Sequence, residues 1–286
     1  MNFYFAAILL GLGFSALALG IFLSLRIFQI PDITTDGSFT LGGAITAVLL
    51  SQHMHALLIL PVVFICGGFA GMITGWIHTR LKVNALLSGI LVMTALYSVN
   101  LALMSRSNIP IINLPDIFSL VSFLPGSIQQ FTLLLLVVSI LWLVLSWILK
   151  TDFGLAMRAT GNNEQMIRSN GVNSHQMKIT GLALANGLTA ISGYLVAQIQ
   201  GFADINMGIG IVILGLGSVM IGEIFLNMFK IRSITMHLAG VIGGSILFRI
   251  ILAFALSLGI DALYLKLIVS VFVLLVVSIP NLRRST

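Results

Sequence analysis

Lys and Arg residues occur in short polar gaps that alternate along an otherwise apolar chain. Of the 14 Lys and Arg residues, only Arg106 and Lys266 fall in the other gaps, and Arg249 lies inside an apolar stretch. Cytosolic loops of membrane proteins are enriched in Lys and Arg. The alternation therefore predicts a protein that crosses a membrane many times, with its basic gaps in the cytosol. The basic-gap residues are Arg26, Arg80, Lys82, Lys150, Arg158, Arg168, Lys178, Lys230, Arg232, Arg283 and Arg284.

The apolar stretches between these gaps predict an all-α, polytopic transmembrane helix bundle with about 8–10 spans. A spanning helix needs roughly 20 apolar residues, and most of the stretches approach that length. An odd number of spans places the N-terminus outside and the C-terminus in the cytosol. Nine segments are counted: 3–25, 39–51, 57–76, 83–104, 131–149, 177–198, 209–225, 234–256 and 262–279.

The second segment, 39–51, is short for a span and carries Gly42 and Gly43 near its start. We interpret it as a possible broken or re-entrant helix, which is tolerated where the backbone lines a protein cavity. If it does not cross, the count falls to eight and the orientation of the N-terminal half reverses. Among the gaps predicted to lie outside, 105–130 is the longest and is expected to form a structured cap.

Composition excludes several classes of function. The chain is 58% hydrophobic and 8% charged, against about 25% charged in a soluble domain, so residues 1–286 are read as one membrane domain. The net charge of +6 is confined to short loops and forms no stripe suited to nucleic acid. No Gly-rich loop followed by Lys and Ser or Thr is present, so the chain is expected to bind no ATP of its own. No metal-ligand cluster or catalytic set has supporting context, and we expect neither enzymatic activity nor a bound cofactor.

Glycine residues recur four apart in two of the apolar segments. Gly67, Gly71 and Gly75 lie on one face of the third segment, and Gly240 and Gly244 on one face of the eighth. Small residues at this spacing allow helix backbones to approach closely. The spacing predicts tight helix packing; a substrate passage with a thin wall is the less favoured alternative.

Charged residues within the membrane are costly and therefore informative. Glu223 ends the seventh segment, and Arg249 lies in the outer half of the eighth. For both we favour structural pairing or snorkelling over a place in a transport pathway.

The segment 31–43, PDITTDGSFTLGG, combines acids, hydroxyls and glycines just before an apolar helix. An Asp at this place is first of all a helix N-cap. A helix start at a break in a membrane span can also bind a ligand group directly. Both roles stay open, and the candidate pathway residues are Asp32, Asp36, Gly37, Ser38 and Thr40.

The cytosolic gap 151–178 is too polar to enter lipid and too patterned to be a linker. Asn162 and Asn163 precede the stretch Glu164 to Ser169, which Asn170 and Gly171 then stop. This predicts a capped helix of about two turns. A helix this short is marginal in water, so we expect it to dock into a groove of a partner.

The loop and its continuation carry a family resemblance. Gly154-Leu155, Arg158-Ala159, Gly161, Gly171-Val172, Lys178, and Gly181 through Gly193 resemble the inner-membrane permeases of ABC importers, in the branched-chain amino acid and ribose permease family. PDITTDGSFTLGG resembles the turn-and-helix motif after that family's first span, and residues 201–223 resemble its amino-acid branch. The resemblance covers roughly residues 30–225, and the first two motifs are specific as a pair.

The resemblance implies a permease subunit in a bacterial plasma (inner) membrane, working as a dimer, with a homodimer favoured. Its implied partners are two cytosolic ATPase subunits, which would hold ATP and Mg, and an external solute-binding protein. It implies transport of a small polar solute, with an amino acid favoured. The loop helix would be the coupling helix, with Gly161, Asn162, Asn163, Glu164, Gln165, Met166, Ile167, Arg168, Ser169 and Asn170 contacting the ATPase.

Other classes of function remain open. A stand-alone secondary carrier would need coupling-ion sites near the membrane midplane, usually acids on discontinuous helices. The midplane here is nearly free of acids, and the patterned cytosolic loop would have no role in such a carrier. A sugar or nucleoside ABC permease is a further alternative, because the fold does not select the solute. A membrane scaffold would need no pathway at all.

Overall fold

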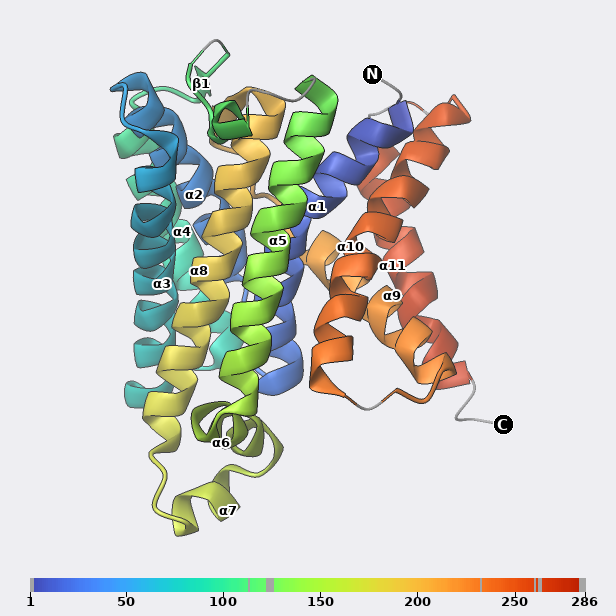
Figure 1. Cartoon of the computed structure of the whole chain (residues 1–286). Coiled ribbons are helices and arrows are strands. Elements are labelled where there is room, and N and C mark those ends of the chain that lie inside the picture. The colour runs from blue at the N-terminus through green and yellow to red at the C-terminus, as the bar shows by residue number, and fades with distance from the viewer. Residues whose placement is uncertain are drawn as a thin grey trace.

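The computed structural model describes residues 3–112, 114–121, 126–231, 233–259, 261 and 264–282. Three of the predicted cytosolic cations, Arg232, Arg283 and Arg284, lie outside the described residues, as do residues 122–125 of the predicted cap. The described chain is a helix bundle with a small sheet at one end (Figure 1). Its elements are α1 (Phe3–Ile21), the π-helical continuation η1 (Phe22–Ile27), α2 (Thr34–Ser51), α3 (Ala56–Arg80), α4 (Ala85–Met104), β1 (Asn108–Pro110), the 3₁₀ helix η2 (Ile117–Val121), α5 (Gly126–Lys150), α6 (Asp152–Asn162), α7 (Glu164–Ser169), α8 (Ser174–Gln200), β2 (Phe202–Asp204), α9 (Ile211–Met228), α10 (Ile234–Ser257) and α11 (Leu265–Leu282).

The predicted polytopic helix bundle is confirmed. Within the described residues, seven helices are long and apolar enough to span a bilayer: α1 with η1, α3, α4, α5, α8, α9 and α10. The apolar stretch found in α11, Leu265–Val276, is shorter. Nine spans would require that α2 and α11 also cross, and that count stays a prediction.

Two helices form the centre of the bundle. The span of α1 is 83% buried and that of α8 is 78% buried, whereas those of α3, α4 and α5 are only 28–33% buried. Large apolar side chains such as Ile65, Phe69 and Trp147 are exposed on these outer helices. In a membrane protein this pattern places α3, α4 and α5 against lipid and α1 and α8 against protein.

The glycine rows act as packing surfaces, as their spacing predicts. A methyl group added at Gly71 would overlap the backbone carbonyl of Leu182 on α8, and one added at Gly75 would come within 2.8 Å of the α8 backbone. Gly244 of α10 lies in the same way against the backbone of α9, and Gly240 lies against the Leu226 side chain of α9. Close backbone approach maximises van der Waals contact where no hydrophobic driving force exists between helices.

The predicted interruption of the second segment is wrong. α2 is continuous from Thr34 to Ser51, so it starts five residues before the apolar stretch does. Gly42 and Gly43 are packing positions: a methyl group at Gly42 would overlap the carbonyl of Ala190 on α8. Most of α2 is buried among α3, α4 and α8, so its polar residues face protein and not lipid.

The two ends of the bundle differ in character. At one end β1 and β2 form an antiparallel pair, with Asn108 opposite Asp204, and this pairing joins two gaps that were both predicted to lie outside. At the opposite end α6 and α7 project beyond the bundle (Figure 1). α9 begins well below the sheet end of α8 in the same view, so the chain between them runs down into the bundle.

Candidate permeation and coupling sites

The start of α2 lies in a buried polar network with α8. Asp32 is 4% exposed and accepts hydrogen bonds from the Thr34 backbone N–H at 2.9 Å and from Asn186 Nδ2 at 2.7 Å. Ser38 donates to Asn186 Oδ1 at 2.7 Å. The hydroxyls of Thr34 and Thr74 lie 2.7 Å apart and link α2 to α3. Buried polar groups need such partners, and here they fix the start of α2 between α3 and α8.

Asp36 holds the start of a different helix from its own. Its carboxylate accepts hydrogen bonds from the backbone N–H groups of Gly210 at 2.9 Å and Val212 at 3.0 Å, in the first turn of α9. Gly210 has φ +82°, a left-handed conformation that glycine adopts without strain. A carboxylate is favoured at a helix N-terminus, where free N–H groups and the helix dipole meet. The expectation that Asp36 caps its own helix is therefore wrong, because it caps α9.

Three of the candidate pathway residues border one small cavity. Asp36, Gly37 and Thr40 line a space of about 280 Å³ that also reaches Asn100 of α4 and Ile209. Asn100 donates to the Gly37 carbonyl at 3.2 Å, while its buried Oδ1 has no hydrogen-bond partner in the described part of the chain. Asp32 and Ser38 do not reach this cavity, because they face Asn186. The predicted pathway motif is thus divided between the small cavity and the buried polar network around Asn186.

A larger cavity lies on the other side of the chain segment that Asp36 anchors. It has a volume of about 650 Å³ and is bordered by α1, α9, α10 and α11 and by the segment between β2 and α9. Ile209 and Gly210 line it, and Ile209 also lines the smaller cavity. Arg249 lies in this larger cavity, with its guanidinium carbon 3.8 Å from the ring centroid of Phe14.

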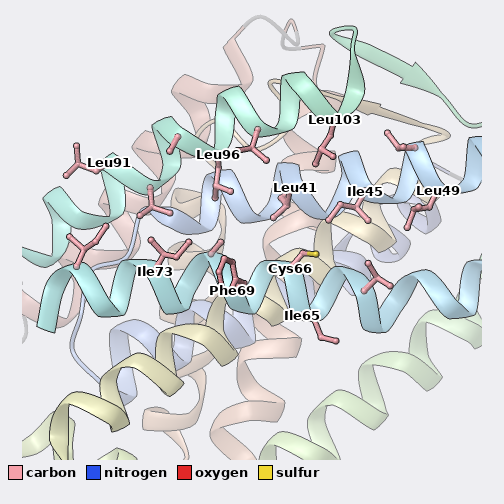
Figure 2. A pocket seen from close by; sticks show the side chains of 17 residues that line it. Leu41, Ile45, Leu49, Ile65, Cys66, Phe69, Ile73, Leu91, Leu96 and Leu103 are labelled. Atoms are coloured by element: carbon pink, nitrogen blue, oxygen red, sulfur yellow. The ribbon is translucent and has the colours of Figure 1, made fainter. Parts of the chain in front are cut away.

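A third hollow has no polar lining. The groove in Figure 2 lies among α2, α3 and α4, has a volume of about 730 Å³ and is lined by aliphatic and aromatic side chains and Cys66. Ile65 and Phe69 on its border are largely exposed, which is the arrangement of a lipid-facing surface. A polar solute would find no hydrogen-bonding partner there.

The loop 151–178 contains the predicted short helix and a second helix that was not predicted. α7 spans Glu164–Ser169, and the Asn163 side chain caps it by accepting from the Met166 N–H at 3.0 Å. A helix that was not predicted, α6, spans residues 152–162, and α8 starts at Ser174, three residues before the apolar segment. α7 has the bounds predicted from its capping residues, Glu164 to Ser169, and the proposed coupling segment 161–170 extends beyond it at both ends.

Gly161 and Asn162 belong to α6 and not to the loop helix. A methyl group at Gly161 would overlap the carbonyl oxygen of Ile27, so α6 packs directly on the end of η1. Leu149 and Met157 are buried in the core beside this contact. α6 is thus a rigid platform that carries α7.

An ion-pair cluster fixes α7 against α8. The Glu164 carboxylate accepts from Arg168 at 2.5 Å, from Ser174 at 2.9 Å and from Lys178 at 2.6 Å. Burial alone would raise the pKa of Glu164, but the hydrogen bonds from Lys178 and Ser174 and the charges of Lys178 and Arg168 lower it from 4.5 to about 2. Glu164 and Arg168 are therefore structural within the loop, whatever else they contact.

The outward face of α7 carries the residues free to meet a partner. Ile167 is buried beneath the helix, whereas Gln165, Met166 and Ser169 are exposed, Met166 to 53%. An exposed Met on a short, well-anchored helix suits insertion into an apolar groove, because its flexible thioether adapts to the groove's shape.

Glu223 forms an ion pair with Arg26, the two side chains approaching to 2.7 Å. Glu223 lies in α9 and Arg26 in η1, so the pair joins α9 to the end of the first span. Arg26 is largely exposed and Glu223 is nearly buried.

Several residues of these sites were not predicted. Asn186 joins Asp32 and Ser38, and it is an amide in the middle of a largely apolar segment, a signal that was available in the sequence. Phe14 beneath Arg249 and Gly210 beside Asp36 carry no such signal, because each acquires its role only through a contact distant in sequence.

Comparison with known proteins decides the family. Residues 3–278 match the family model described as branched-chain amino acid transport system / permease component. The chain belongs to this permease family. It is 38% identical over 271 residues to a tyrosine transport system permease protein of Clostridioides difficile, covering 95% of this chain and 89% of the relative. A ribose import permease protein of Haemophilus influenzae is more distant, at 26% identity over 194 residues, which are 67% of this permease and 59% of the relative. No solved structure matches the chain.

Family membership and the apolar helices together establish a multi-pass membrane permease of the ABC importer type. Such permeases are transport subunits and not enzymes. The resemblance of the motifs at 31–43 and in the loop 151–178 is thus confirmed at the level of the family.

Proposed function

We propose that this permease imports an amino acid that an external solute-binding protein delivers, in a complex driven by two cytosolic ATPase subunits that bind ATP and Mg. The observation that carries the proposal is the 38% identity, over 95% of this chain, to a tyrosine transport permease. The ribose import permeases match at only 23–26% identity and over 67–88% of this chain. The difference favours an amino acid over a sugar. The basic end of the bundle, with α6 and α7, faces the cytosol.

The geometry of α7 supports its role as the contact to an ATPase. It is capped, clamped to α8 by Glu164 and seated on α6, yet its outer face is exposed. A short helix needs this anchoring to keep its shape. A force applied at its outer face then moves α6 and the helix ends beneath it without first unfolding the loop.

Cross-linking tests the docking directly. Because Cys66 is the only cysteine, a C66A background gives a cysteine-free permease. M166C should cross-link to a cysteine placed in the groove of the ATPase subunit, and S107C, on an exposed site at the other end, should not. Absence of a cross-link from both M166C and Q165C in an active complex would exclude α7 as the docking helix.

Uptake measurements test the substrate class. Membranes containing the permease, its ATPase and its binding protein should accumulate a radiolabelled amino acid in an ATP-dependent way, and excess unlabelled ribose should not compete. ATP-dependent uptake of ribose with no amino acid competing would assign the complex to the sugar branch instead. Uptake driven by an ion gradient without ATP would identify a secondary carrier.

We infer that motion at α7 reaches the cavities through a chain of direct contacts. α6 packs on η1 through Gly161, Arg26 of η1 pairs with Glu223 of α9, and the other end of α9 is held by Asp36. E223Q should keep substrate-independent ATP hydrolysis but lower substrate-stimulated hydrolysis, and R26Q combined with E223Q should be no worse than either alone. Fully additive losses would show that the pair does not act as a unit.

The permease is proposed to act as a homodimer, because closed two-fold assemblies are the commonest and two ATPases require two docking helices. Mass measurement of the purified complex in lipid discs should find two copies of this chain. One copy with an active ATPase pair, or a second, different permease, would contradict the homodimer.

A further inference from the structure

The 650 Å³ cavity has the position of a receiving chamber for substrate. Its border includes β2 and the segment that follows it, at the end of the bundle opposite α7, and its inner border is the start of α9 at Gly210 and Ile211. Cavities of about 300–1,000 Å³ are typical of small-molecule sites. It is lined by apolar side chains together with a few polar ones, which is also typical of such sites.

Arg249 is a cation of this cavity that has no hydrogen-bonding or ion-pair partner among the described residues. None of the three ion pairs in the described part of the chain involves it, and its guanidinium makes no hydrogen bond there. Its guanidinium lies over the face of Phe14, which in turn stacks on Phe39 with the ring centroids 5.6 Å apart and the planes 6° apart. The ring face orients the guanidinium but leaves its N–H edges unused.

A guanidinium in a membrane-protein cavity, without an acidic partner among the described residues, is expected to bind an anion. Arginine is costly within a membrane and is normally paired there, and its planar fork matches a carboxylate with two parallel hydrogen bonds. Asp204 also borders the cavity, but its carboxylate already accepts from Asn108 at 3.3 Å and from the Asn206 N–H at 2.8 Å. Lys266 of α11 adds a second cation to the border.

We propose that this cavity binds a small substrate with an apolar body, and that Arg249 binds the substrate's carboxylate. The inference rests on the proposed import of an amino acid and adds the group that recognises it. The apolar lining accommodates the side chain of an aromatic or branched amino acid. Phe14 is a positioning residue, because it acts only by holding the guanidinium.

Ligand protection of a cysteine tests this on the permease alone, without ATPase or binding protein. Ser270 lies on the exposed border of the cavity, so S270C in the C66A background should react with a soluble thiol reagent. Phenylalanine at high concentration should slow that reaction at least 5-fold, and phenethylamine, which lacks the carboxylate, should not. R249Q should abolish the protection, R249K should keep part of it, and R106Q, the same charge change on an exposed outer loop, should leave it unchanged.

The outcomes separate the possible ligands. Equal protection by phenylalanine and phenethylamine, or full protection in a folded R249Q permease, would overturn the proposal. Phosphatidylglycerol in the vesicles could instead protect the cysteine in a way that depends on Arg249, with no effect of phenylalanine. That result would identify a lipid headgroup as the anion and would also overturn the proposal. Failure of ATP-driven amino acid uptake with protection intact would instead reject the importer assignment and leave the carboxylate site standing.

Discussion

Removing the carboxylate of Asp36 should loosen the start of α9 and the cavity wall it holds. D36A deletes both acceptors, so the N–H groups of Gly210 and Val212 lose their partner. D36N keeps one oxygen and can satisfy one of the two N–H groups, and the amide nitrogen then faces the other. The expected order of damage is D36A, then D36N, then wild type.

The size of the effect follows from the two hydrogen bonds. An N–H group left buried and unpaired costs about 1–3 kcal/mol, so D36A should cost about 2–6 kcal/mol. Asp36 is only part-buried, and water reaching the N–H groups reduces the loss toward about 2 kcal/mol. Two kcal/mol corresponds to roughly a 30-fold change in a local opening equilibrium.

Hydrogen exchange measured by mass spectrometry reports this opening. Peptides covering residues 205–214 should exchange roughly 30-fold faster in D36A than in wild type, with a smaller increase in D36N, and uptake should fall in the same order. D152N is the control, because Asp152 is an exposed acid in the first turn of α6 and contacts neither cavity. Wild-type exchange in D36A would refute the reasoning, since it would mean that the carboxylate does not hold α9.

The remaining predictions concern packing, pH and orientation. G71A should lower the free energy of unfolding by about 1–3 kcal/mol because its methyl group overlaps the α8 backbone. G68A is the control, since its methyl group would lie 3.4 Å from its nearest neighbour and should change the stability little. Equal melting temperatures of the two variants would argue against tight packing of α3 on α8. Glu164, with its pKa lowered from 4.5 to about 2, stabilises the loop fully above pH 4.5 and loses that contribution as the pH falls toward 2. The rate at which a protease cleaves the loop should therefore stay constant from pH 8 to 5 and rise below pH 5. In E164Q the loop should be cleaved at an elevated rate at every pH. N170C, exposed beside α7, should resist an impermeant thiol reagent in intact cells and react after lysis, whereas S107C should react in both conditions. Labelling of N170C in intact cells would show that the chain has the opposite orientation in the membrane.

The bundle could be predicted because membrane burial leaves a strong signal in sequence. Long apolar stretches are required by the thickness of the bilayer, and the loop cations follow the orientation. The short helix at 164–169 was also predictable, since Asn163 and Gly171 mark its ends with local chemistry. α6 was missed because its residues are amphipathic and polar, and its helix depends on packing Gly161 against the end of the first span.

The partners of the charged residues were not predictable. Asp36 and Gly210 are 174 positions apart in the sequence, and nothing local relates them. Asp36 in the first turn of α2 has the appearance of a cap for its own helix, and only the descent of the segment after β2 brings the start of α9 to it. In the same way, the sequence shows that Arg249 is an arginine within an apolar stretch. Only the fold shows that Phe14 covers one face of its guanidinium and that no acid in the described part of the chain pairs with it.

The division of the 31–43 motif follows from helix geometry once the start of α2 is known. Successive residues of a helix are rotated by about 100°. Asp36, Gly37 and Thr40 then lie within about 100° of one another and face α4 and the start of α9, while Thr34 and Ser38 lie on the opposite side, toward α3 and α8. The sequence placed the helix start at residue 39, which left these side chains in an irregular segment without defined faces. Extending the helix by five residues is what separates a structural side, where Ser38 donates to Asn186, from a side that borders the smaller cavity.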